Sequence, residues 1–144
     1  MNPGTEECPS AAAPTLAGLR VLAVDDDPDT LDLVAELLSL RGAEVVPAPS
    51  AAAALAALQR FAPDVLVSDI GMPDRDGYDL IRDVRGLGHG PDDLPAVAVT
   101  AFTSAEDRRR ALEAGFQVHL AKPVDPGVLT AVVARLGRGT VESG

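Results

Sequence analysis

The sequence predicts an α/β fold in which five parallel strands form one sheet with helices packed on both faces. Two observations lead to this prediction. Short apolar runs alternate five times with segments whose apolar residues recur at helical spacing. The chain has 144 residues, of which 47% are hydrophobic, so it can bury the core of one ordinary domain.

The first two strand and helix units lie before residue 61. We expect strands at 19–24 and 43–47, each followed by a helix, at 28–41 and 51–60. Asp27 and Pro28 are a typical N-cap and first helical residue, and Ser50 is a typical N-cap for the second helix. Gly42 stands where a glycine commonly ends a helix. These capping residues support the predicted boundaries.

Three further units complete the predicted fold. We expect strands at 64–68, 94–100 and 116–121, and helices at 77–85, 104–114 and from 125–126 to 136. Ser104 would cap the helix that Gly115 ends. The last helix places apolar residues on one face: Val128, Leu129, Val132, Val133 and Leu136.

The domain is expected to span residues 18–137. Residues 1–17, rich in Pro, Ala, Ser and Thr, are interpreted as a flexible N-terminal tail or linker, and residues 138–144 as a flexible C-terminal tail. The one cysteine, Cys8, lies in the first tail, so no internal disulfide is expected. We expect no output domain after the last helix.

Charge and hydropathy exclude several classes of function. The net charge of −10 argues against direct nucleic-acid binding, which requires basic patches. No apolar run reaches the ~20 residues of a membrane-spanning helix, so no membrane insertion is expected. Residues 1–15 lack the features of a secretory signal. Together these features favour a cytoplasmic protein.

Polar residues follow four of the predicted strands. They are Asp25, Asp26 and Asp27 after the first strand, Asp69 after the third, Thr100 at the end of the fourth and Lys122 after the fifth. Ligands of open α/β sheets bind outside the carboxyl ends of the strands. We therefore expect these side chains to converge on one pocket.

This set of residues suits phosphoryl transfer to a carboxylate. Several carboxylates held together repel one another and need a positive partner. Lys122 supplies one positive charge, and a hard divalent cation with oxygen ligands, Mg²⁺ or Mn²⁺, would supply two more. A carboxylate in such a site can act as a nucleophile and form an acyl phosphate.

Each residue also has an ordinary structural interpretation. Asp27 is interpreted chiefly as a helix cap, Thr100 could be a strand-end threonine, and Lys122 could be a surface lysine. The functional interpretation depends on all of them falling at the same edge of one predicted sheet.

Four segments resemble the signatures of bacterial two-component receiver domains. They are VLAVDDDP at 21–28, SDIGMPDRDG at 68–77, VTA at 99–101 and AKP at 121–123. The resemblance runs from about residue 19 to residue 136, and the four segments occur in the family's order. It implies a flavodoxin-like doubly wound sheet with strand order 2-1-3-4-5, and a cis peptide bond between Lys122 and Pro123.

The resemblance also implies roles at the site. Asp69 would accept a phosphoryl group from the phosphohistidine of a histidine kinase or phosphotransfer protein. Asp25, Asp26 and Asp69, with the backbone carbonyl of Gly71, would hold the metal. Lys122 would pair with Asp69 or its phosphate.

Thr100 would bond a phosphoryl oxygen, and Thr100 and His119 would form the switch. The output would be a changed surface for a downstream effector protein, in a monomer or weak homodimer. The chain would catalyse only its own phosphorylation and dephosphorylation, either as a stand-alone protein or as part of a hybrid histidine kinase.

Two positions depart from the family pattern. His119 occupies the position of an aromatic switch residue; it is interpreted as a tolerated replacement, or alternatively as a hydrogen-bonding or pH-sensitive switch. Phe102 follows Thr100 by two residues and is expected to cover part of the phosphoryl site, which would make phosphate loss slow.

Three other functions share some of these features. A phosphatase of the haloacid-dehalogenase type would need an acid where Gly71 stands. A flavin-binding electron carrier would need a hydroxyl-rich loop where the three aspartates stand. An adaptor domain that no longer takes phosphate is the third alternative, and the intact acidic set argues against it.

Overall fold

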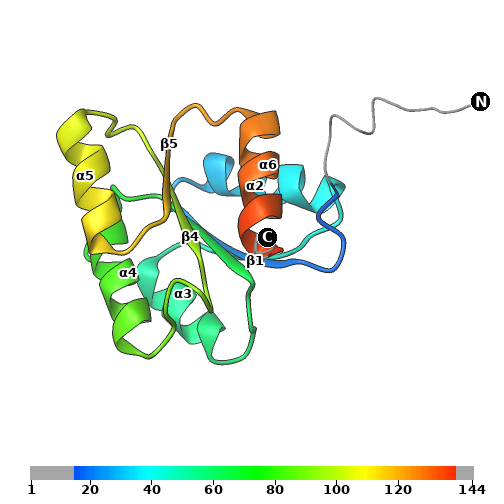
Figure 1. Ribbon diagram of the computed structural model, residues 1–144, viewed down its shortest axis with the longest axis horizontal. Helices are drawn as coiled ribbons and strands as arrows, with labels where there is room; N and C mark the ends of the chain where they lie inside the picture. The colour runs from blue at the N-terminus through cyan, green and yellow to red at the C-terminus, as the bar shows by residue number, and fades with distance from the viewer. Residues whose placement is uncertain (1–14, 139–144) are drawn as a thin grey trace, which may run out of the picture.

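A computed structural model describes residues 15–138 of the chain. Five parallel strands form one sheet in the order β2-β1-β3-β4-β5, as predicted (Figure 1). The strands are β1 (Arg20–Val24), β2 (Glu44–Ala48), β3 (Val65–Ser68), β4 (Ala96–Thr100) and β5 (Val118–Ala121). The helices are α2 (Pro28–Leu40), α3 (Ala51–Leu58), α4 (Gly77–Gly86), α5 (Ala105–Ala114) and α6 (Pro126–Gly137).

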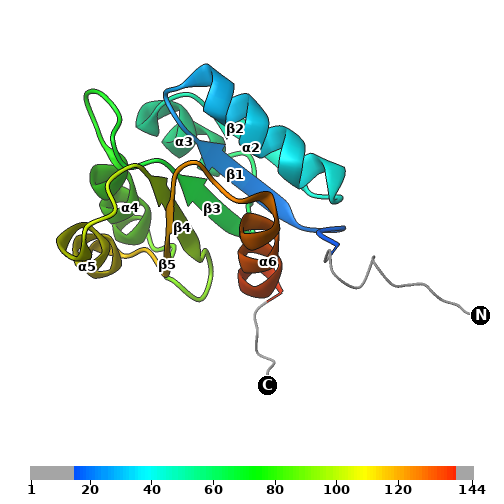
Figure 2. The same cartoon turned by 90° about the horizontal axis from the view of Figure 1, so that it is seen from above.

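The helices form a layer on each side of the sheet. Figure 1 shows α3, α4 and α5 on one face and α2 and α6 on the other, and Figure 2 shows the same arrangement from above. Successive strand residues point to opposite faces, so Leu22 packs in the core beneath α3 and α4, whereas Val21 packs beneath α2 and α6. Both faces are covered, which explains why the central strands β1, β3 and β4 are mostly apolar and buried.

Side-chain caps begin the helices as the sequence predicts. Asp27 accepts a hydrogen bond from the amide of Asp29, Ser50 from the amide of Ala53, and Ser104 from the amide of Asp107. The structure adds a capping box at α4, in which Asp76 and Asp79 each accept from the other's backbone amide.

The last two strands begin two residues later than predicted, at Ala96 and Val118. The side chain of Gln117 accounts for part of the difference, because its Oε1 accepts a hydrogen bond from the Ala96 amide at 2.8 Å. The Arg85 guanidinium donates to the same oxygen at 3.0 Å. At this end of the sheet these side-chain bonds stand beside the backbone bond from the Gln117 amide to the Ala96 carbonyl, at 2.9 Å.

Packing begins before residue 18, inside the segment predicted to be a tail. Leu16 is fully buried in the core beneath α2 and α6, and its amide donates to the carbonyl of Arg41 at 2.7 Å. Arg138 donates to the carbonyls of Thr15 and Ala17, each at 3.1 Å. Both ends of the described chain are thus held together, at the C-terminal ends of α2 and α6. Most of the two predicted tails, with Cys8, lies outside the described residues.

Between residues 15 and 138, the helices are all too short or too polar to cross a lipid bilayer.

Candidate functional site

The acidic residues of the site directly extend strands of the sheet. Asp25 follows β1, and its amide donates to the carbonyl of Ala48 at 3.2 Å. Asp69 follows β3, and its amide donates to the carbonyl of Val24 at 2.9 Å. The sheet ladder therefore continues one residue past the strands and fixes the backbones that carry these two carboxylates. Parallel strands end at one edge, which brings the two residues together.

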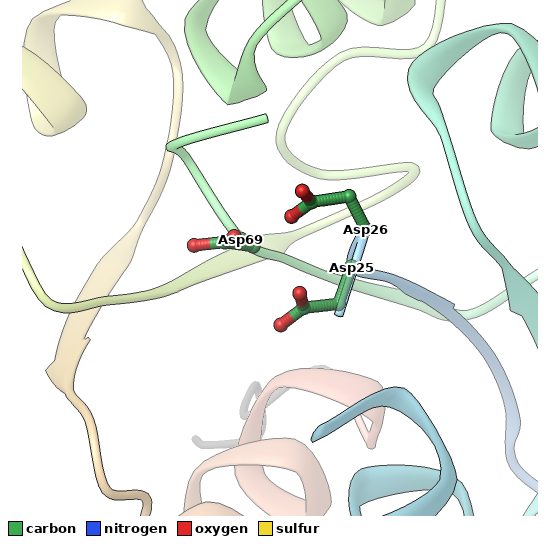
Figure 3. Close-up of side chains that lie close together, drawn as sticks. All are labelled: Asp25, Asp26 and Asp69. Atoms are coloured by element: carbon green, nitrogen blue, oxygen red, sulfur yellow. The ribbon is translucent and has the colours of Figure 1, made fainter. Parts of the chain in front are cut away.

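Three carboxylates gather at this edge. Oxygens of Asp25, Asp26 and Asp69 lie within 4.8 Å of one another. Figure 3 shows these side chains reaching from the ends of β1 and β3 toward the same space. Asp25 and Asp69 are buried, at 5% and 6% exposure, whereas Asp26 is exposed. The predicted convergence of these residues is confirmed.

Lys122 reaches the same group from the end of β5. Its Nζ lies 2.9 Å from Oδ2 of Asp25 and 3.5 Å from Oδ1 of Asp69. The lysine amide donates to the carbonyl of Thr100 at 3.0 Å, so the ends of β4 and β5 stay paired here. The peptide bond from Lys122 to Pro123 is cis, as the family resemblance implied. In this state the ammonium group is closer to Asp25 than to Asp69.

The charges of the site are unbalanced. Burial, and then the negative charge of Asp25, raise the pKa of the Asp69 carboxyl above its usual 3.8, and Lys122 only partly offsets them. Burial alone would lower the pKa of the Lys122 ammonium group. The hydrogen bond to Asp25 and the charges of Asp69 and Asp25 outweigh that effect and hold the pKa above its usual 10.5. Lysine therefore stays charged, while Asp69 is an unusually basic carboxylate.

A pocket opens over the acidic group. Its lining residues are Asp25, Asp26, Asp27, Asp69, Gly71, Thr100, Ala101, Phe102 and Lys122. Four carboxylates thus face a single ammonium group, and the donor set consists of hard oxygens. This set fits a divalent cation such as Mg²⁺, which prefers oxygen ligands and balances carboxylate charge. Asp27 also caps α2 and bonds the Thr30 hydroxyl, in agreement with its predicted capping role.

Thr100 and His119 are joined through the loop after β4. Thr100 is buried, and its hydroxyl accepts a hydrogen bond from the amide of Phe102 at 3.0 Å. The carbonyl of Phe102 accepts a hydrogen bond from Nε2 of His119 at 2.9 Å, so this nitrogen carries the proton. The backbone of Phe102 therefore links the two predicted switch residues.

The ring of Phe102 lies over Gly71. A methyl group built on Gly71 would come within 2.9 Å of the ring, so a larger residue at position 71 would push the ring of Phe102 aside. The ring is half exposed at the mouth of the pocket.

Ser68, which lies directly before Asp69, was not predicted from the sequence to belong to the site. Its fully buried hydroxyl donates to the carbonyl of Asp69 at 2.8 Å. The sequence did contain a signal for this residue: a serine at the end of an otherwise apolar strand, directly before Asp69.

The comparisons with known proteins agree with this geometry. Residues 21–134 match the family described as the response regulator receiver domain. An uncharacterized 14.6 kDa protein of Leptolyngbya boryana is 50% identical over 119 residues, which cover 83% of this chain and 90% of that protein. The sensor histidine kinase RcsC of Salmonella typhimurium is 39% identical over 116 residues, which cover 81% of this chain but only 12% of the kinase.

A solved structure has the same architecture. The CheY-like response regulator receiver domain protein of Methanospirillum hungatei superposes with a TM-score of 0.75 at 30% identity. The match covers 87% of this chain and 98% of that one.

Proposed function

Since the chain belongs to the response regulator receiver domain family, we propose that it accepts a phosphoryl group on Asp69 and thereby switches a protein-interaction surface. One observation carries this proposal more than any other: Asp25, Asp26 and Asp69 meet Lys122 at one edge of the sheet. Receiver domains are signalling domains, and the chemistry proposed here is confined to the chain's own aspartate. The acidic pocket belongs to the region that matches the family.

The covalent step requires one free oxygen on Asp69. Oδ1 accepts a hydrogen bond from the Ile70 amide at 2.8 Å and faces Lys122, which leaves Oδ2 for attack. Oδ2 would attack the phosphorus of a phosphohistidine. A phosphorus–oxygen bond forms as the phosphorus–nitrogen bond breaks, the electron pair goes to the imidazole nitrogen, and that nitrogen takes a proton from water. The raised pKa of Asp69 makes this carboxylate a better nucleophile once it is ionised.

Asp25, Asp26 and Asp69, with the carbonyl of Gly71, are the residues that would hold Mg²⁺ or Mn²⁺. A bound divalent cation supplies charge neutralisation for the phosphoryl oxygens. Lys122 adds a further positive charge on the side of β5. Its ammonium group now pairs with Asp25 and Asp69 and can move toward the phosphoryl group when that group adds negative charge to Asp69.

Thr100 and His119 would carry the switch. The Thr100 hydroxyl can exchange its bond with the Phe102 amide for a bond to a phosphoryl oxygen. Because His119 holds the carbonyl of the same residue, the loop cannot move without changing the surroundings of His119. A population shift between two loop positions would therefore change the surface around α5 and β5. Both interpretations of His119, as a tolerated replacement and as an active switch, stay predictions.

The partners follow from this chemistry. The phosphoryl donor would be a histidine kinase or phosphotransfer protein, and the receiver of the signal a downstream effector protein. The match to a 116-residue segment of a sensor histidine kinase supports a role beside such kinases. We also propose that the protein acts in the cytoplasm. We further propose a monomer or weak homodimer, with a domain close to residues 18–137.

The test is intact-mass analysis after incubation with acetyl phosphate and Mg²⁺. Wild-type protein should gain one phosphoryl group, and the gain should vanish in Asp69→Ala and with a chelator. No gain in wild type, together with no binding of beryllofluoride, would favour the adaptor alternative.

Phosphate loss should be slow, because the Phe102 ring restricts the approach of water to the pocket. We expect Phe102→Ala to shorten the lifetime of the aspartyl phosphate severalfold, measured by intact mass over time after removal of the donor. Leu87→Ala, which trims another exposed apolar side chain far from the pocket, is the control. A wild-type half-life of seconds that Phe102→Ala and Phe102→Glu leave unchanged would contradict this role.

A further inference from the structure

Ser68 has a buried hydroxyl for which the proposed chemistry has no use. The residue is fully buried at the end of β3. Because side chains alternate along a strand, it lies on the same face as Leu66, which packs with α3 and α4. A hydroxyl buried in an apolar layer needs a hydrogen-bond partner. Among the described residues that partner is the backbone carbonyl of Asp69, at 2.8 Å.

The acceptor belongs to the peptide unit that joins Asp69 to Ile70. At the other end of the same planar unit, the Ile70 amide donates to Oδ1 of Asp69 at 2.8 Å. Carbonyl and amide of one peptide rotate together because the unit is rigid. A serine that fixes the carbonyl therefore also fixes the direction of the amide that holds the Asp69 carboxylate.

Backbone contacts with α4 also restrain this peptide. Gly77 lies against the Asp69 carbonyl, and the Gly77 amide donates to the carbonyl of Ile70 at 2.8 Å. The first contact limits the space around the Asp69 carbonyl, and the second holds the next peptide unit. The hydroxyl of Ser68 is the side-chain donor that acts directly on the Asp69 carbonyl.

We propose that Ser68 is a positioning residue for the phosphoacceptor: its hydroxyl holds the 69–70 peptide so that the Ile70 amide anchors Oδ1 of Asp69 and leaves Oδ2 free to attack. This inference rests on the proposed function for its effect on rate. The hydrogen-bond relay itself is independent of phosphorylation.

The test compares three variants. Ser68→Ala removes the donor, Ser68→Thr keeps a hydroxyl, and Thr130→Val is a matched control. Thr130 is also a buried residue whose hydroxyl donates to a backbone carbonyl, that of Pro126 at 2.8 Å, but it lies in α6 and does not touch the 69–70 peptide. Thermal unfolding establishes that each variant is folded. If Ser68→Ala is not, Ser68→Cys replaces it, because a thiol is a weak donor of similar size.

The first readout is the chemical shift of the Ile70 amide proton without phosphate or metal. It should move in Ser68→Ala, stay near wild type in Ser68→Thr and be unchanged in Thr130→Val. The second is the rate of phosphoryl gain from acetyl phosphate with Mg²⁺. This rate should fall roughly tenfold in Ser68→Ala, because the Asp69 carboxylate is no longer held in place. In Ser68→Thr the rate should return toward the wild-type value.

Two results would overturn the proposal: an Ile70 amide shift that Ser68→Ala does not change, or an equal loss of rate in Thr130→Val. A wild-type protein that takes no phosphoryl group would instead refute the proposed function, and the amide shift would still decide whether Ser68 positions Asp69.

Discussion

Replacing Gly77 by alanine should destabilise the domain by about 2 to 4 kcal/mol. A Cβ at this first residue of α4 would lie 2.5 Å from the carbonyl oxygen of Asp69 and 2.7 Å from Cα of Ile70. Both are backbone atoms at the end of the sheet, so neither can move aside as a flexible side chain could. The better helix propensity of alanine, about 1 kcal/mol, is too small to offset this clash.

The same helix provides the control. Gly86 is the last residue of α4, it is exposed, and nothing lies within 4 Å of a Cβ built on it. Gly86→Ala should therefore stabilise the protein by about 0.5 to 1 kcal/mol. Chemical denaturation of both variants measures the difference. Equal free energies of unfolding for Gly77→Ala and Gly86→Ala would contradict the close contact between Gly77 and the backbone of Asp69.

Neutralising Asp69 should have opposite effects on stability without and with metal. The folded pKa of Asp69 is raised, so between its usual 3.8 and that higher value the folded protein holds a proton that the unfolded chain has released. Stability therefore falls as pH rises through this window, and the loss is complete above it. In a chelator at pH 7, Asp69→Asn should unfold at a higher temperature than wild type, and the difference should shrink as pH falls toward 4.

Adding Mg²⁺ should reverse the order. A ligand at one hundred times its Kd stabilises the folded state by about 2.7 kcal/mol, which raises the melting temperature by roughly 5 to 10 °C. Wild type should show this rise, and Asp69→Asn much less of it. The exposed Asp92→Asn removes the same charge far from the site and should follow wild type in both conditions. An Asp69→Asn variant less stable than wild type in the chelator would contradict the electrostatic argument.

The positions of the site residues were predictable because the side chains follow strand ends. In a parallel sheet, residues at the carboxyl ends share one edge whatever their distance along the chain. That rule is sufficient to place Asp25, Asp69 and Lys122 together from the sequence. The four family segments then supplied the strand order and the cis peptide bond, which periodicity alone does not give.

Other features depend on distances of a few tenths of an ångström and could not be predicted. The bond from His119 to the Phe102 carbonyl, and the ring of Phe102 over Gly71, require the path of a loop that has no periodic pattern. The bond from the Ala96 amide to the Gln117 side chain, at the start of β4, depends on the rotamer of Gln117. Leu16 lies in a segment of tail-like composition, where a single buried leucine leaves no periodic signal.

The clasp between Arg138 and the carbonyls of Thr15 and Ala17 makes this domain a good scaffold for circular permutation. The ends of the described chain lie beside each other, so a short glycine-rich linker could join them without pulling the fold apart. New ends could be opened in the exposed turn after α4, around Gly88. Fluorescent reporters fused there would lie near α4, away from the clasp, and would be suited to following the proposed phosphorylation of Asp69.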